Sequence, residues 1–129
     1  QRLSRGLGDV YKRQRYMDSI ERLWEVIGHL NVGLCLDTCH TWAGGIPTID
    51  AVKGFKKLVK KIDLIHFNDS KDGFESSRDR HENLGKGKIP KEELEYVIKN
   101  AKTDIIVETP NGPDAQKKDI AWIKRRLKK

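Results

Sequence analysis

The sequence is poor in cysteine and has no long apolar run. Its two cysteines, Cys35 and Cys39, are too few for a disulfide framework, and their spacing fits neither a redox Cys-x-x-Cys pair nor a zinc ribbon. We expect reduced thiols that pack as small buried residues about a strand, in a protein of the cytoplasm. No apolar run approaches the ~20 residues of a membrane span, so we expect no membrane partner. No Gly-rich phosphate-binding fingerprint follows an apolar run, which argues against a nucleotide-binding fold.

The composition is that of a globular chain with a mild excess of positive charge. Hydrophobic residues make up 36% of the 129 residues and charged residues 35%, which suits one ordinary domain with a core. The formal net charge is +7, and residues 1–14 hold four basic residues against one acidic residue. This charge is compatible with a polyanionic partner, but a solvated basic surface explains it as well. Residues 1–14 show no regular period, so we expect an extraneous, disordered or non-native segment before a domain at 15–129.

From residue 16 on, the apolar pattern predicts helices that alternate with strands. We expect four amphipathic helices, at 16–30, 49–62, 90–98 and 120–127, and three buried strands, at 32–36, 63–67 and 105–107. A long polar loop covers 68–88. Regular alternation of this kind predicts an α/β fold in which crossover helices join parallel strands. Three strands alone would leave two unpaired edges, so we expect the chain to be part of something larger.

Acidic and histidine side chains recur where the predicted strands end. The candidates are Asp37 and His40 after the first strand, His66 at the end of the second, Glu108 at the end of the third, and Asp79 and His81 in the polar loop. In parallel α/β architectures the carboxyl ends of the strands share one face, and that face carries the functional site. We therefore expect these six side chains to converge.

The mixture of imidazole and carboxylate ligands predicts which metal this site would prefer. Such a set suits Zn²⁺, and also Mn²⁺ or Fe²⁺, whereas carboxylates alone would indicate Mg²⁺. Six ligands exceed the need of one tetrahedral ion, so a cluster of two or more ions is implied. Clustered metals suit phosphodiester hydrolysis, because they activate water and neutralise charge on the attacking and leaving oxygens.

Each candidate also has a structural interpretation. The alternatives are a hydrogen-bonded structural histidine at His66, a turn cap at Asp37, an ordinary strand-end acid at Glu108, and a surface ion pair of Asp79 with Arg78 or Arg80. Because acids and histidines recur at the same end of every strand, we favour a shared site over these separate roles. His29 and the two cysteines we interpret as structural, with contact between Cys39 and a metal as the alternative.

Three motifs in this chain resemble those of the endonuclease IV family of abasic-site endonucleases. They are Leu34–His40 (LCLDTCH), His66–Lys71 (HFNDSK) followed by Asp79–Gly87 (DRHENLGKG), and Val107–Pro110 (VETP). They occur in the family's order over residues 16–129. The resemblance implies the C-terminal portion of a (β/α)₈ TIM barrel, with about three β/α units and parallel strands.

The resemblance also implies a function and a set of ligands. The full-length parent would be a monomer whose three zinc ions cut the phosphodiester 5′ to abasic sites in duplex DNA, a step of base excision repair. One zinc would be held by Asp37, His66 and Glu108 and another by His40, Asp79 and His81, with Glu108 also orienting the attacking water. Mn²⁺ is an alternative metal. We further interpret Lys71, Arg78 and Arg80 as DNA phosphate contacts, with a solvated loop as the alternative.

Two departures from the family pattern limit what this chain can do. Glu75 stands where the family usually has Gly or Asn, which affects the turn before Asp79 and His81. The family's remaining ligands, two His and a bridging Glu, belong to earlier strands, which this sequence does not contain. We therefore expect the fragment to lack full activity. The alternatives are a metal-dependent sugar isomerase or epimerase on a related barrel and a non-catalytic fragment.

Overall fold

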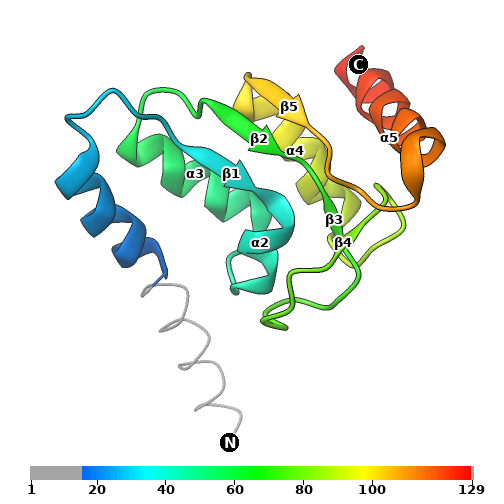
Figure 1. Ribbon diagram of the computed structural model, residues 1–129, viewed down its shortest axis with the longest axis horizontal. Coiled ribbons are helices and arrows are strands. Elements are labelled where there is room, and N and C mark those ends of the chain that lie inside the picture. Colours follow the sequence, from blue (N-terminus) through cyan, green and yellow to red (C-terminus); the bar gives the residue numbers. More distant parts are fainter. Residues whose placement is uncertain (1–15, 129) are drawn as a thin grey trace, which may run out of the picture.

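The computed structural model describes residues 16–128, and its scaffold is a small parallel sheet covered by helices (Figure 1). The sheet contains β1 (Cys35–Asp37), β2 (Leu64–His66) and β5 (Asp104–Ile106), in the order β1-β2-β5. Both pairings are parallel, as the alternating pattern predicts. The predicted extraneous segment at 1–14 lies outside the described residues.

Amphipathic helices form one layer against this sheet. They are α3 (Thr48–Leu58), α4 (Lys91–Ala101) and α5 (Gly112–Leu127), and α4 packs against both of the others. Pro47 and Pro90 precede α3 and α4 directly, because proline suits a helix start, where its missing N–H costs nothing. The core between the layers includes Leu36, Val52, Phe55, Ile65, Phe67, Leu94 and Val97, all buried. Within the described range, no helix combines the length and the apolar character needed to cross a membrane.

Three short elements were not expected from the sequence. One is the helix α2 (Thr38–Ala43), and the other two are the strands β3 (Asp69–Ser70) and β4 (His81–Glu82), which pair antiparallel inside the predicted loop 68–88. Strands of two residues are too short to show alternation, and α2 follows β1 without a break. The first strand also begins at Cys35, three residues later than predicted. Val32 lies before the sheet, and its side chain is 46% exposed.

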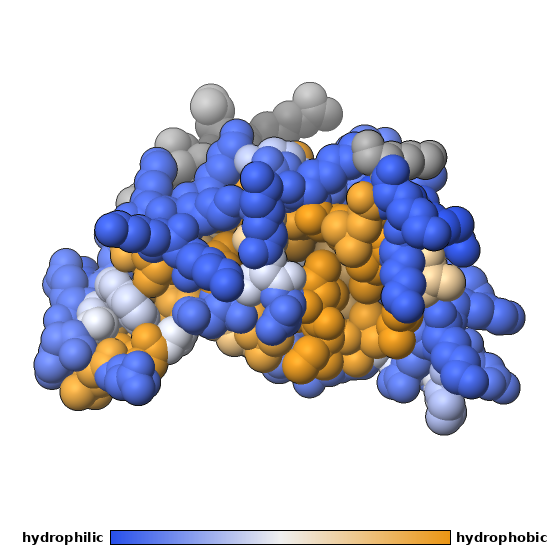
Figure 2. All heavy atoms as spheres, turned by 90° about the horizontal axis from the view of Figure 1, so that it is seen from above, coloured by the Kyte–Doolittle hydropathy of each residue, from blue (hydrophilic) through white to orange (hydrophobic). Residues whose placement is uncertain are grey.

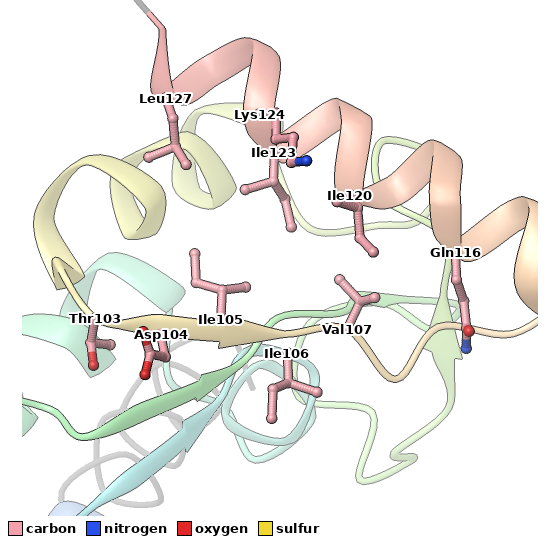
Figure 3. A pocket seen from close by; sticks show the side chains of 10 residues that line it. All are labelled: Thr103, Asp104, Ile105, Ile106, Val107, Gln116, Ile120, Ile123, Lys124 and Leu127. Atoms are coloured by element: carbon pink, nitrogen blue, oxygen red, sulfur yellow. The ribbon is translucent and has the colours of Figure 1, made fainter.

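An apolar groove of about 540 Å³ lies between β5 and α5. Ile105 and Val107 point toward α5, whose Ile120 and Ile123 face them, whereas Ile106 points to the opposite side (Figure 3). This alternation is the normal period of a strand. Figure 2 shows hydrophobic atoms gathered on this side of the molecule, bordered by hydrophilic side chains. In the part of the chain that the structure describes, β1 and β5 each have only one neighbouring strand, so both edges of the sheet are open.

Candidate metal centre

The register of the sheet places Asp37 and His66 side by side. Asp37 pairs with His66 across β1 and β2, and His66 pairs with Ile106 across β2 and β5. Glu108 follows two residues beyond Ile106, at the same end of the sheet. Each of the three strands therefore brings a candidate ligand to the carboxyl-terminal end of the sheet, beside α2 and the β3–β4 hairpin (Figure 1). This end of the sheet is called its edge below.

His66 contacts both acids of this first group. Its Nδ1 lies 3.1 Å from Oε2 of Glu108 and 3.8 Å from Oδ2 of Asp37. The fully buried Asn68 holds the two acids in place: its Nδ2 donates to Oδ2 of Asp37 at 3.5 Å, and its Oδ1 accepts the backbone N–H of Glu108 at 2.8 Å. These contacts bring Asp37, His66 and Glu108 together.

The second group forms around Asp79. Its two carboxylate oxygens face two imidazoles, with Oδ2 3.4 Å from Nδ1 of His40 and Oδ1 3.5 Å from Nε2 of His81. His40 is carried by α2, which begins after Asp37, and Oδ1 of Asp37 accepts the backbone N–H of His40 at 3.0 Å. Asp37 therefore does cap a turn, as the structural alternative proposed, but only one of its oxygens is used for this.

The two groups meet at His81. Its Nε2 lies 3.8 Å from Oδ2 of Asp37, and its Nδ1 donates to the backbone carbonyl of Glu108 at 3.0 Å. Asp37, His81 and Glu108 each offer a ligand atom, and these atoms lie within 4.8 Å of one another. The six predicted residues thus form one continuous cluster at the edge of the sheet, from His40 at one end to Glu108 at the other.

The loop between β3 and β4 is docked onto the end of α2. The backbone N–H groups of Glu75 and Ser77 donate to the carbonyls of Trp42 and Ala43, each at 3.0 Å. Glu75 has a φ of 63° and Ser77 a φ of 61°, in the left-handed region that favours Gly and Asn. Glu75 therefore makes this turn with the backbone strain that a side chain larger than glycine brings.

The basic residues of this loop differ in whether the structure shows them paired with a carboxylate. Arg80 forms two hydrogen bonds with Asp72, from Nε to Oδ2 at 2.8 Å and from Nη2 to Oδ1 at 2.6 Å. The Arg80 guanidinium holds the pKa of the Asp72 carboxyl below its usual value. Arg80 is thus paired with Asp72 and not with Asp79, while Lys71 and Arg78 are exposed.

The two cysteines differ from each other. Cys39 is fully buried, as predicted, and its Sγ donates to the carbonyl of Arg80 at 3.5 Å. Burial raises the pKa of the Cys39 thiol to about 12. Cys39 also lies with Asp79 and His81 in a group whose ligand atoms are within 4.8 Å of one another. The prediction that Cys35 is buried was wrong, because β1 begins at this residue and leaves it exposed.

Two residues near the cluster were not assigned a role from the sequence. Asn68 lies within the HFNDSK motif, but an amide after a strand carries no signal that it will bridge two acids. Tyr16 lies on the helix at 16–27, with its ring centroid 6.3 Å from that of His40. Burial raises the pKa of Tyr16, and the nearby charges of Asp37 and Asp79 raise it further. The apolar period of the sequence places Tyr16 at the start of a helix but does not predict that it lies beside His40.

Comparisons with known proteins agree with this geometry. Residues 9–126 match the family described as "Xylose isomerase-like TIM barrel". The chain belongs to this family. The α/β fold with parallel strands is therefore confirmed as part of a xylose isomerase-like TIM barrel.

Several members of this barrel family are similar to the chain. The "Probable endonuclease 4" of Mycobacterium tuberculosis (strain H37Ra) is 45% identical over 119 residues, which are 92% of this chain and 46% of the relative. That of Mycobacterium ulcerans (strain Agy99) is 43% identical over 120 residues, covering 93% and 47%. The crystal structure of endonuclease IV from Thermus thermophilus superposes with a TM-score of 0.70 at 28% identity, covering 84% of this chain and 43% of that chain. The resemblance to endonuclease IV is thereby confirmed, and the chain spans about half the length of the curated relatives it matches.

Proposed function

We propose that this chain supplies the zinc-binding C-terminal part of an enzyme that hydrolyses the phosphodiester 5′ to abasic sites in duplex DNA. The observation that carries the proposal is the convergence of three histidines and three carboxylates at one edge of the sheet, within a chain similar to proteins named endonuclease 4. Sugar isomerases on related barrels also gather such ligands, but the relatives described above are named endonucleases. The parent enzyme would act as a monomer in the cytoplasm.

The donor set fits zinc. His81 donates from Nδ1 to the carbonyl of Glu108, which fixes its tautomer and leaves Nε2 as the free ligand atom, directed at Asp37 and Asp79. Mixed imidazole nitrogens and carboxylate oxygens suit Zn²⁺, and also Mn²⁺, better than Mg²⁺. Among the described residues, the ion-pair partners of Asp37, Asp79 and Glu108 are histidines rather than lysines or arginines, so no fixed cation competes for these carboxylates.

The resemblance to endonuclease IV implies the roles of the residues, and the contacts between the side chains support them. Asp37, His66 and Glu108 would hold one zinc ion, and His40, Asp79 and His81 another. Zinc at such a site supplies a Lewis acid that activates water and neutralises charge on phosphate oxygens. Glu108 would also help to orient the attacking water. Exposed Lys71 and Arg78 would contact DNA phosphates, whereas Arg80 would first have to leave Asp72.

The proposal is tested by a chimera in which residues 9–126 replace the matching segment of the Mycobacterium tuberculosis relative. We expect the zinc-loaded chimera to incise a labelled duplex with one abasic site on its 5′ side, and not an intact duplex. His66→Ala should reduce incision to background and remove one bound zinc equivalent. The matched control is His29→Ala, since His29 is exposed and lies outside the cluster.

Two outcomes would contradict the proposed function. One is a folded, zinc-loaded chimera that leaves abasic DNA intact but interconverts an aldose and a ketose, which would favour the isomerase alternative. The other is incision that survives His66→Ala. The 129-residue chain alone should bind zinc but incise abasic DNA weakly or not at all, because the resemblance assigns a bridging Glu and two His to strands that precede β1.

A further inference from the structure

A buried pair of polar side chains, Asn83 and Asp119, joins the end of β4 to α5. Asp119 on α5 is 3% exposed and Asn83, just after β4, is 4% exposed. Oδ2 of Asp119 accepts from Nδ2 of Asn83 at 2.8 Å, and Oδ1 accepts from the backbone N–H of Leu84 at 2.9 Å. Both oxygens of this buried carboxylate are thus used by the segment at 83–84.

Asn83 also reaches the segment that follows β5. Its Nδ2 donates to the carbonyl of Pro110 at 3.0 Å, and its Oδ1 accepts from Nδ2 of Asn111 at 2.6 Å. An amide offers two donor hydrogens and one oxygen acceptor, so every polar atom of the Asn83 side chain has a partner. A single buried side chain therefore fastens three parts of the chain to one another: the end of β4, the segment after β5 and α5.

The fastened segments are those that carry two candidate ligands. His81 lies two residues before Asn83, and Glu108 lies two residues before Pro110. The two ligands are in direct contact, because Nδ1 of His81 donates to the carbonyl of Glu108 at 3.0 Å. The hydrogen bonds of Asn83 thus hold the two backbone segments at the separation that this contact requires.

We propose that Asn83 and Asp119 are positioning residues that set the distance between His81 and Glu108 and thereby the affinity of the centre for zinc. This inference rests on the zinc site of the proposed function but not on its DNA substrate. Asp119 orients Asn83, and Asn83 holds the two ligand-bearing segments. If the Asn83 amide or the Asp119 carboxylate is removed, β4 and the segment after β5 can move apart. His81 and Glu108 are then no longer close enough to serve the same metal centre.

The test is a zinc titration of the 129-residue chain by calorimetry, with the metal alone as the ligand. We expect Asn83→Ala to lower zinc affinity by about 10- to 100-fold, as the loss of outer-shell partners does at other metal sites. The control is Asn100→Ala, which removes the hydrogen bond from Nδ2 of Asn100 to the carbonyl of Tyr96 on α4, away from the centre. Thermal melting without metal measures how far Asn83→Ala and Asn100→Ala are each destabilised. Their zinc affinities are compared only at temperatures at which both are folded.

Three further variants keep the test decisive if Asn83→Ala does not fold. Asn111→Gly removes one bond to Asn83 at an exposed position with a φ of 74°, which glycine adopts easily, and we expect a several-fold loss of zinc affinity. Asn83→Asp places two buried carboxylates against each other and should bind zinc weakly. Adding Asp119→Asn to Asn83→Asp restores a donor opposite an acceptor, and we expect it to recover part of the affinity.

The result that overturns the inference is a folded Asn83→Ala or Asn111→Gly variant with the zinc affinity of the unmodified chain. A loss of affinity that the exchanged pair fails to recover would also count against it, because it would assign Asn83 a general role in stability. If the unmodified chain binds no zinc, the proposed function fails first. If zinc binds and the variants weaken it while the chimera leaves abasic DNA intact, only the proposed substrate is wrong.

Discussion

Asp69 offers the sharpest test of how the loop after β4 is held. Its side chain is fully buried, and its carboxylate accepts four backbone N–H groups. Oδ1 accepts from Ser70 at 2.8 Å and Ile89 at 3.1 Å, and Oδ2 accepts from Gly85 at 3.0 Å and Gly87 at 3.1 Å. One side chain at the start of β3 thus satisfies the backbone of the turn that leads to α4.

The change Asp69→Asn keeps the size of the side chain and removes half of this acceptor set. An amide NH₂ cannot accept, so one pair of N–H groups loses its partner and faces a donor instead. A hydrogen bond to a charged group contributes about 1.5–3 kcal/mol, so the loss of two should lower the free energy of unfolding by about 3–6 kcal/mol. Small domains have about 5–15 kcal/mol in total, and the variant should therefore be close to unfolding at room temperature.

Urea unfolding measures this change, and amide exchange locates it. We expect the midpoint of Asp69→Asn to fall sharply, with the N–H groups of either Gly85 and Gly87 or Ser70 and Ile89 exchanging faster. The matched control is Asp104→Asn, an exposed aspartate of β5 whose substitution should change stability by less than about 0.5 kcal/mol. A loss below about 1 kcal/mol in Asp69→Asn, with all four amides still protected, would refute the reasoning that this carboxylate holds the turn.

Two further predictions concern thiols and acid. In the folded chain a thiol reagent at about pH 8 should modify exposed Cys35 but not Cys39, because burial raises the pKa of the Cys39 thiol to about 12. Mass spectrometry counts the modified thiols, and rapid modification of both cysteines would contradict this prediction. The hydrogen bonds from Arg80 lower the pKa of Asp72 in the folded chain. The Arg80–Asp72 pair therefore stabilises the fold at any pH above the ordinary carboxyl pKa, and this stabilisation is lost as the pH falls through the lowered pKa of Asp72. Between about pH 6 and about pH 2.5 the urea midpoint should therefore fall further in the unmodified chain than in Arg80→Ala, and equal falls would show that the pair contributes nothing.

The sequence predicts the main sheet and the place of the candidate site because both depend on strand direction. Once helices and strands alternate, the strands must run parallel, and residues after each strand must share an edge. That single constraint brings Asp37, His66 and Glu108 together although up to 71 positions separate them in the sequence. The zinc ions and the DNA contacts remain predictions, since they depend on the family resemblance.

What the sequence does not predict is decided by tertiary contacts. The α2 helix is six residues long and forms where Asp37 caps it and the β3–β4 loop packs on its end. Arg80 looks available for phosphate, but Asp72 is brought opposite it by the turn of the loop. Asn83 and Asp119 stand 36 positions apart, and no local pattern relates a polar residue after a strand to one on a distant helix.

The double use of Asp37 has a consequence for how its variants are interpreted. One carboxylate oxygen caps α2 and the other faces the imidazoles of His66 and His81, so an alanine at this position would remove a helix cap and a ligand at once. The two losses are separable only with Asp37→Asn, whose remaining oxygen can still accept from His40 while its charge is gone. In this chain one side chain determines both the start of a helix and the charge at the edge of the sheet.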